Sequence, residues 1–480
     1  MRFLLLVLFV GIVVFPNNLL FGQKNPLQVP HKVALNHRSK EFYQHEDIAP
    51  IPQVAADSAP LLSQDDFTTA WTFDQVISEM LTSDPRLRIG KEDIRQARAE
   101  YWTSSLLPNP NFTAESGALP FRSIEGEYWG GPPEMNFQVE FPVDWFLFAK
   151  RKAAMNSAGW EVHQAQAEYA DLIRQRITET ATLFYDLLEA KALLDVSHQD
   201  VGILSDLEQI AKSGVEAGGI PAVEWRRIGL DLLRCRQEVL EAEKNLDILK
   251  AKLRSQFGRT DYDPNFDITG DLDAPTNMDP MPLEEAFTMA QQNRPDIRVL
   301  RMQISKSRAG VLAENRNAYP EVTTFAGAGR EYAKLADADK NYNSWGIGVS
   351  VSVPLFDRNQ GNRAKAKSAF AQSNHQYQAG IVDLRAEIVE ADRNFRTAHQ
   401  QAHSIATEEV RLSKEVRDIM IEGFKAGGRP LIDILDAERS YRETVRLFVT
   451  SRADYWRALY IYNSVVGVDS VNNVHTATVH

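Results

Sequence analysis

The chain has 480 residues, of which 44% are hydrophobic and 25% charged, a composition typical of folded globular proteins. Its formal net charge of −12 argues against nucleic acid as a partner, because phosphate binding needs a clustered positive field. The single cysteine, Cys235, excludes an intrachain disulfide and any Cys-x-x-Cys motif. Its neighbours have helical periodicity, which indicates a small helix residue and not a catalytic thiol.

The N-terminus has the pattern of an export signal. Arg2 is followed by an apolar stretch from Leu4 to Phe15, which is long enough for a signal peptide and too short to span a bilayer. We expect residues 1–22 to be a signal peptide. No other window approaches about 20 apolar residues, so a membrane location would depend on β-strands. Residues 23–68, rich in Pro, His, Gln and Ala, are expected to form an extended or disordered arm.

The chain contains two copies of one unit. The helical stretch 73–110 resembles 283–320, with Pro85 matching Pro295, and "GVEAGGIP" aligns with "GFKAGGRP". The matching anchors are separated by about 210 residues, which is the signature of an internal repeat. The predicted divisions are a first repeat (69–258), a linker (259–280), a second repeat (281–467) and a C-terminal tail (468–480).

Four strands are predicted, two in each repeat. In "FQVEFPV" and "WGIGVSVSVP" apolar residues alternate with small or polar ones, as in a strand with one apolar face. A half-buried strand of a soluble sandwich has the same alternation. Four strands cannot close a barrel, and open sheet edges are not tolerated in lipid. Either the strands are not in a membrane, or two or three chains share one barrel. The strands are expected at about 109–119, 134–144, 320–332 and 344–355.

The long helices are unusual for a globular protein. No proline occurs from Leu147 to Ser213, a span of about 100 Å if helical. Its apolar residues are spaced as in a heptad-like seam, and the segment 363–422 is similarly long. A structural coiled-coil stalk in the cell envelope would explain these helices equally well, although it leaves the alternating strands unexplained.

Catalytic and metal-binding motifs are not found. The sequence contains no HExxH, GxSxG or phosphate-binding loop, so we expect no enzyme, no catalytic residues and no cofactor. His399 and His403 are four residues apart and share a helix face. We interpret them as a solvated pair in preference to a two-ligand metal site, and assign no metal site.

The stretch Gly427–Arg439, "GGRPLIDILDAER", gathers charge beside a turn. Glycines end one helix, the proline suits the first turn of the next, and Asp433 and Asp436 share a face of that helix. The first repeat has Glu224 where the second has Asp433, but no counterpart of Arg429. In a closed oligomer these carboxylates would form rings at the tip of a helical tube, an arrangement that selects cations.

The chain resembles the TolC family of outer-membrane efflux proteins over roughly residues 70–467. "VPLFDRNQGNRAKAKSA", "GFKAGGRPLIDILDAERSY" and the doubled architecture carry the resemblance. It implies a mixed α/β membrane protein of a Gram-negative-type envelope: a trimeric, 12-stranded outer-membrane β-barrel with four strands per chain, continued into the periplasm by a long α-helical barrel. The function implied is a passive exit duct of a tripartite system.

The resemblance also implies site residues and partners. The pore gate and acidic constriction would comprise Arg429, Asp433, Asp436, Glu224 and Phe424. The family often has tyrosine at the position of Phe424. The tip turns 217–221 and 426–430 would contact a periplasmic adaptor through Ala217, Gly218, Gly219, Pro221, Ala426, Gly427, Gly428 and Pro430. Further partners are the other chains of a homotrimer, an inner-membrane pump of the resistance-nodulation-division type, and outer-membrane lipid. "PLFDRNQGN" resembles the heavy-metal branch; a drug-efflux or type I secretion duct is the alternative.

Overall fold

The computed structural model describes residues 70–117, 134–219, 221–261, 263, 265–273, 280–335, 338–425 and 429–468. The signal peptide and arm predicted within residues 1–68 lie outside them, as does the tail after Val468.

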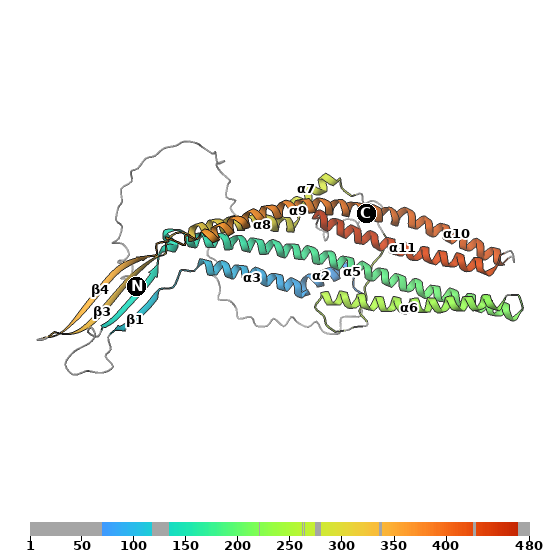
Figure 1. The fold of residues 1–480 in the computed structure, drawn as a ribbon. Helices are drawn as coiled ribbons and strands as arrows, with labels where there is room; N and C mark the ends of the chain where they lie inside the picture. Colours follow the sequence, from blue (N-terminus) through green and yellow to red (C-terminus); the bar gives the residue numbers. More distant parts are fainter. Residues whose placement is uncertain are drawn as a thin grey trace. The chain divides into compact units, whose positions relative to one another are not determined.

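The same order of elements occurs twice along the described chain: two helices, two strands, then long helices that form a hairpin. The first series is α2 (Phe73–Ser83), α3 (Pro85–Ser105), β1 (Asn111–Gly117), β2 (Glu134–Pro142), the short α4 (Asp144–Leu147), α5 (Lys150–Glu216) and α6 (Ala222–Gln256). The second is α7 (Leu283–Asn293), α8 (Pro295–Asn317), β3 (Val322–Leu335), β4 (Ala338–Val351), α9 (Gln360–Gln400), the π-helical turn η2 (Gln401–Ile405), α10 (Ala406–Lys425) and α11 (Leu431–Val466). Figure 1 shows the strands β1, β3 and β4 close together, with the long helices extending away from them.

The four strands form one antiparallel sheet in the order β1-β2-β3-β4. The β2–β3 pairing joins the two halves of the chain, with Glu134 opposite Glu331 and Pro142 opposite Thr323. β3 and β4 are paired as far as Leu335 and Ala338. The sequence-based limits of about 320–332 and 344–355 are therefore wrong at the hairpin, because the backbone ladder continues through polar residues that show no apolar alternation.

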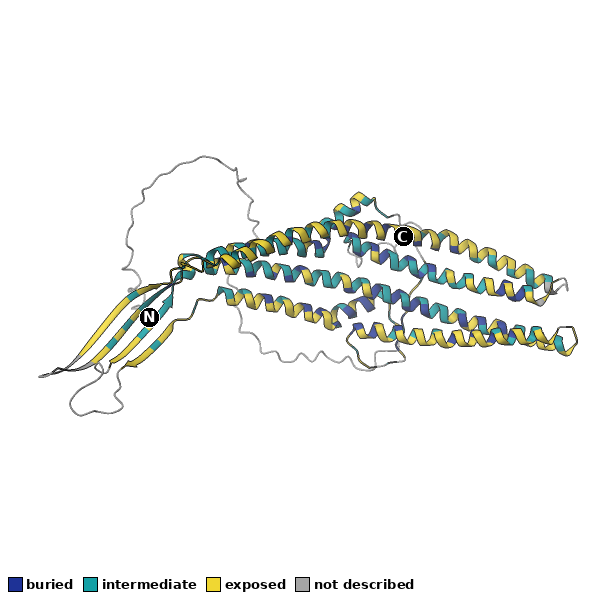
Figure 2. Ribbon diagram, viewed as in Figure 1, coloured by how far each residue is buried: buried dark blue, intermediate teal, exposed yellow. Residues whose placement is uncertain are grey.

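The sheet exposes large apolar side chains. On β4, Trp345 and Ile347 are 81% and 72% exposed, and Phe112 on β1 is 68% exposed. Figure 2 shows exposed residues running along the strands, whereas buried residues concentrate in the helices. A sheet that packed its apolar face into a soluble core would bury these side chains, so this face is left for something outside the chain.

Four buried clusters of apolar side chains hold the described helices together, and two of them are large. The first contains Met80, Phe184 and Leu253 from α2, α5 and α6, and also Phe266 and Ile268 from the segment predicted to be a linker. That segment is thus part of the folded core. Its side chains Phe266 and Ile268 are buried, and the backbone N–H of Trp71 donates to the backbone carbonyl of Asp267. The second cluster packs α7 and α9 against α11.

An ion pair fixes the junction of the two short helices in each half. Asp84 caps α3 by accepting from the backbone N–H of Arg86, and its second oxygen binds Arg176 Nε of α5 at 2.5 Å. Arg294 stands before α8 and binds Asp296 and Glu387, each at 2.6 Å. Both junction residues are at most 5% exposed.

Candidate functional site: the hairpin tips and an ionic tier between the halves

The first hairpin tip is a glycine turn. α5 ends at Glu216, and the backbone N–H of Gly219 donates to Gly214 at 2.9 Å. Gly218 has φ +74°, the left-handed conformation that glycine adopts without a Cβ penalty at helix ends. Ala217 ends the helix, and Pro221 precedes the first residue of α6.

Glu224 lies in the first turn of α6, half-buried, where the positive end of the helix dipole stabilises a carboxylate.

The second tip is described on its α11 side. Ala426, Gly427 and Gly428 lie outside the described residues, as does the side chain of Phe424 in α10. α11 begins at Leu431 after Pro430. The described tip residues are therefore Arg429, Pro430 and those that follow.

Arg429 pairs with Asp433 of the same chain. The nearest atoms, Arg429 Nη1 and Asp433 Oδ2, are 3.5 Å apart, and the side chains are 55% and 33% exposed. Asp436 is exposed one turn further along α11. An exposed pair of this kind contributes little stability, about 0–1 kcal/mol, so the contact is easily exchanged for another partner.

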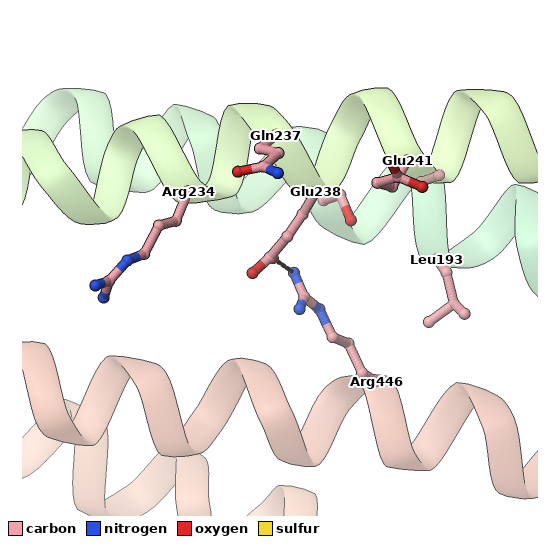
Figure 3. A pocket seen from close by; sticks show the side chains of 8 residues that line it. Leu193, Arg234, Gln237, Glu238, Glu241 and Arg446 are labelled. Carbon is pink, nitrogen blue, oxygen red and sulfur yellow. Dashed lines mark hydrogen bonds and ion pairs between the residues drawn. The ribbon is translucent and has the colours of Figure 1, made fainter.

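A stronger ionic tier lies deeper, between the two hairpins. Arg446 of α11 donates to Asp200 of α5 at 2.9 Å and to Glu238 of α6 at 2.6 Å. Each lies about 16 residues from the tip end of its helix, or ~24 Å along the axis. Figure 3 shows the Arg446–Glu238 contact crossing a cleft of about 430 Å³ between the helices.

The two carboxylates of this tier differ in solvation, because the Asp200 side chain is 5% exposed and that of Glu238 is 46% exposed. Burial raises the pKa of Asp200, with Arg446 and Arg442 opposing the shift. Burial likewise raises the pKa of Glu438, which lies 3.9 Å from Arg417 Nε. Nearby, Arg442 Nη1 donates to the Cys235 sulfur at 2.8 Å, so this cysteine is buried between helices. Its place within helix α6 is as predicted.

A family model described as "Outer membrane efflux protein" matches residues 76–259 and 287–459, most of the chain. The chain belongs to this family. The resemblance to the TolC family is thereby confirmed, and so is the expectation of an efflux channel of the outer membrane that reaches into the periplasm.

A curated relative and two solved structures resemble the efflux protein. The "Cobalt-zinc-cadmium resistance protein CzcC" of Cupriavidus metallidurans is 26% identical over 63% of this chain and 70% of its own. A crystal structure of CusC matches with a TM-score of 0.69 and 16% identity, covering 82% of this chain and 92% of that chain. VceC of Vibrio cholerae matches with a TM-score of 0.66 and 16% sequence identity, covering 82% of this chain and 96% of that chain. The fold is thus that of the TolC-like channels.

The ionic tier escaped the sequence analysis of this efflux protein. Arg446 is 246 and 208 residues from Asp200 and Glu238, and helix periodicity does not reveal which helices are neighbours. One sequence signal could have indicated the tier. In both halves, charged residues lie about the same number of residues from the Gly-Gly turn.

The described helices of the efflux protein offer no stretch long and apolar enough to cross a membrane. Nor do the described residues contain a group of three or more His, Cys, Asp or Glu that could hold a metal ion. The interpretation of His399 and His403 as a solvated pair does not hold for their Nε2 atoms, although both residues are half-buried and not fully buried. Both Nε2 atoms are buried, because η2 packs against α11 and sets the two rings beside Tyr455.

Proposed function

We propose that the protein is the passive outer-membrane duct of a tripartite efflux system, that it works as a homotrimer, and that it exports heavy-metal cations. Family membership supports the duct. The cargo is proposed because a relative is named for cobalt, zinc and cadmium resistance. A pump of the resistance-nodulation-division type and a periplasmic adaptor would supply energy and cargo, and the duct itself would carry out no catalysis.

The observation that carries a barrel shared between chains is the open, outwardly apolar sheet, and the number of three chains follows the resemblance to the TolC family. β1 and β4 are each paired on one side only among the described residues. Lipid does not tolerate unpaired backbone groups, so the edges must meet the edges of other chains. Three chains give twelve strands, an allowed even number, with Phe112, Trp345 and Ile347 facing lipid.

The helices would continue this barrel as a periplasmic tube built from two related halves. The recurring element order and the two separate matches of one family model support the duplication. α6 exposes Leu230, Leu233 and Leu240, each at least 58%, a stripe suited to packing against a neighbouring chain. The tips would then face the adaptor, through the turn residues Ala217, Gly218, Gly219, Pro221, Ala426, Gly427, Gly428 and Pro430.

At the tip, Asp433 and Asp436 would form acidic rings, with Glu224 contributing from the first half and Phe424 at the gate. Threefold repetition places three copies of each carboxylate around one axis, and such rings favour cations. Arg429 would hold the tip closed. Its contact with Asp433 is weak and exposed, so binding of an adaptor can replace it at little cost.

Single-channel conductance in a planar bilayer under a salt gradient tests the duct. We expect small, cation-selective openings from the wild type. Asp433→Ala/Asp436→Ala should open to a larger conductance or lose selectivity, and Arg429→Ala should raise the resting leak. The matched control, Glu243→Ala/Asp247→Ala, removes the same charge from exposed positions of α6 far from the tip and should leave selectivity unchanged.

Absence of conductance from verified, inserted protein would overturn the duct and favour the envelope stalk. If neither the conductance nor the cation selectivity of the Asp433→Ala/Asp436→Ala variant differs from the wild type, the acidic constriction alone is overturned. Cargo is tested separately, in a strain lacking the protein. Loss should increase sensitivity to cobalt, zinc and cadmium salts; sensitivity to drugs alone, or failure to secrete a protein, would establish the other cargo.

A further inference from the structure

Glu438 of α11 is a buried carboxyl that the proposed function leaves unused. It follows Pro430 by two helical turns, which places it ~12 Å along the helix from the second tip. The residue is 2% exposed, and its Oε1 atom is buried without a hydrogen-bond partner among the described residues. Such an atom costs about 1–3 kcal/mol and calls for an explanation, because nearly all buried polar groups in folded proteins are paired.

The nearest cations are engaged elsewhere. Arg417 Nε of α10 lies 3.9 Å from Glu438 Oε2, which is too far for a hydrogen bond. The guanidinium of Arg417 donates instead to Asp418 on its own helix, at 3.1 and 2.9 Å. Arg442, one turn after Glu438, donates to the sulfur of Cys235. An ionised Glu438 would therefore be buried with cations in its surroundings and with no hydrogen-bonded counter-charge.

The surroundings of Glu438 raise its pKa above the ordinary value of 4.5. Burial is the main cause; Arg417 and Arg442 oppose the shift, and Asp200 and Asp418 add to it. Titratable and charged groups reach this region from all four helices of the two hairpins: Asp200 of α5, Cys235 and Glu238 of α6, Arg417 and Asp418 of α10, and Tyr441, Arg442 and Arg446 of α11.

We propose that Glu438 is a proton-binding site that sets how tightly the tip half of α11 packs against its neighbouring helices. With the proton bound, the carboxyl is neutral, and the apolar contacts of Ile434 and Leu435 with α5 and α6 hold this part of α11 in place. When the proton leaves, a buried carboxylate without a hydrogen-bonded partner favours water, and α11 loosens from its neighbours near the tip. The proposal concerns packing within one chain and does not rest on conduction by the duct.

The direction of the pH effect follows from linkage. The packed state holds the proton of Glu438 more firmly than the loosened state does. The stability that this adds is fully present below the ordinary pKa of 4.5 and is lost as the pH rises through the raised value. Acidification therefore favours the packed tip. Burial raises the pKa of Asp200 as well, so the test has to separate the two carboxyl groups.

Hydrogen exchange of the purified full-length protein between pH 4 and 8 measures the packing of residues 432–445. Variants are compared with the wild type at the same pH, so the intrinsic pH dependence of exchange cancels. We expect Glu438→Gln, which copies the neutral carboxyl, to exchange more slowly at pH 7, by up to about tenfold for each unit of raised pKa. The two rates should converge as the pH falls toward 4.5. Glu443→Gln, at an exposed position of the same helix, is the matched control and should exchange like the wild type.

Two further measurements keep the test decisive. In an Asp200→Asn background the difference between Glu and Gln at position 438 should persist; its disappearance would assign the titration to Asp200 and overturn the proposal. The wild type alone, corrected for the intrinsic exchange of each amide, should lose protection around residues 432–445 as the pH rises. Protection that stays constant or increases with pH would overturn the site, as would faster exchange in Glu438→Gln than in the wild type, which would show that the ionised carboxylate stabilises the packed tip.

Discussion

The two halves of the chain fix the same helix junction with ion pairs of opposite polarity. In the first half the carboxylate of Asp84 precedes the proline and the long helix supplies Arg176; in the second, Arg294 precedes the proline and the long helix supplies Glu387. The two ion pairs also differ in how far their side chains are exposed to solvent. Asp84 and Arg176 are 1% and 4% exposed, whereas Glu387 is 48% exposed. Position and pairing are therefore shared, while the polarity and the depth of burial differ.

The largest expected effect comes from breaking the buried pair. Asp84→Ala leaves the Arg176 charge inside the helix bundle and removes a helix cap, so we expect a loss of about 3–5 kcal/mol in the free energy of unfolding. Arg294→Ala should cost less, because its carboxylate partners are partly hydrated. Chemical denaturation of the purified protein measures both. Glu179→Ala, an exposed partner of Arg176, is the control, and an equal or larger loss in Arg294→Ala would contradict the comparison.

An intermediate effect is expected where the two halves meet, at Arg446. Arg446→Gln leaves Asp200 buried without its main counter-charge, and we expect a loss of about 1–3 kcal/mol at pH 7. Because burial already raises the folded pKa of Asp200, its contribution to stability is greatest below its ordinary pKa and is lost as the pH rises through the folded value. The defect should therefore shrink as the pH falls toward 4.

Denaturation curves of the Arg446→Gln variant between pH 4 and 8 would show this trend. Arg234→Gln, which breaks the exposed pair with Asp231 on α6, should cost less than about 1 kcal/mol at every pH. A defect of Arg446→Gln that stays constant with pH would show that the Asp200 contact does not join the halves energetically.

The smallest expected effect is at the first tip. Gly218→Ala places a Cβ in the left-handed conformation and should cost about 1–2 kcal/mol of local stability. Gly229→Ala is the matched control, because this helical glycine of α6 has open space around its Cβ position and should gain about 0.5–1 kcal/mol. Faster hydrogen exchange around residues 214–219 in Gly218→Ala alone would support a tip that requires glycine in the left-handed conformation. Equal exchange in both variants would argue against such a requirement.

The family and the kinds of element could be predicted, because they depend on local patterns. Period-two alternation in "WGIGVSVSVP" indicated a strand, and the proline-free span from Leu147 indicated a long helix, which the structure has as α5. The extended β3–β4 hairpin could not be predicted, since the sequence of residues 332–341 shows no apolar alternation although the backbone ladder runs through it. The π turn has no proline or glycine within Gln401–Ile405 to signal it.

The candidate site was predicted only in part. Arg429 and Asp433 are four residues apart, on either side of the start of α11, so the local turn into that helix brings them together. Asp200, Glu238 and Arg446 meet only after α11 packs beside α5 and α6, which depends on the tertiary arrangement of two hairpins. His399 and His403 were correctly placed on one face, but their burial depends on η2 packing against α11.

The antiparallel contact between β2 and β3 has a consequence for biogenesis. Glu134 and Glu331 are partners in the sheet although nearly half the chain separates them. Contacts between residues so far apart in sequence form late in folding, because a long loop must close before the strand pairing offsets the entropy cost of closing it. The sheet therefore stays unfinished until the second half of the chain is present. Assembly of the strands must follow synthesis and export, and a chain truncated before β3 would retain only the β1–β2 hairpin, too little for a stable sheet in water.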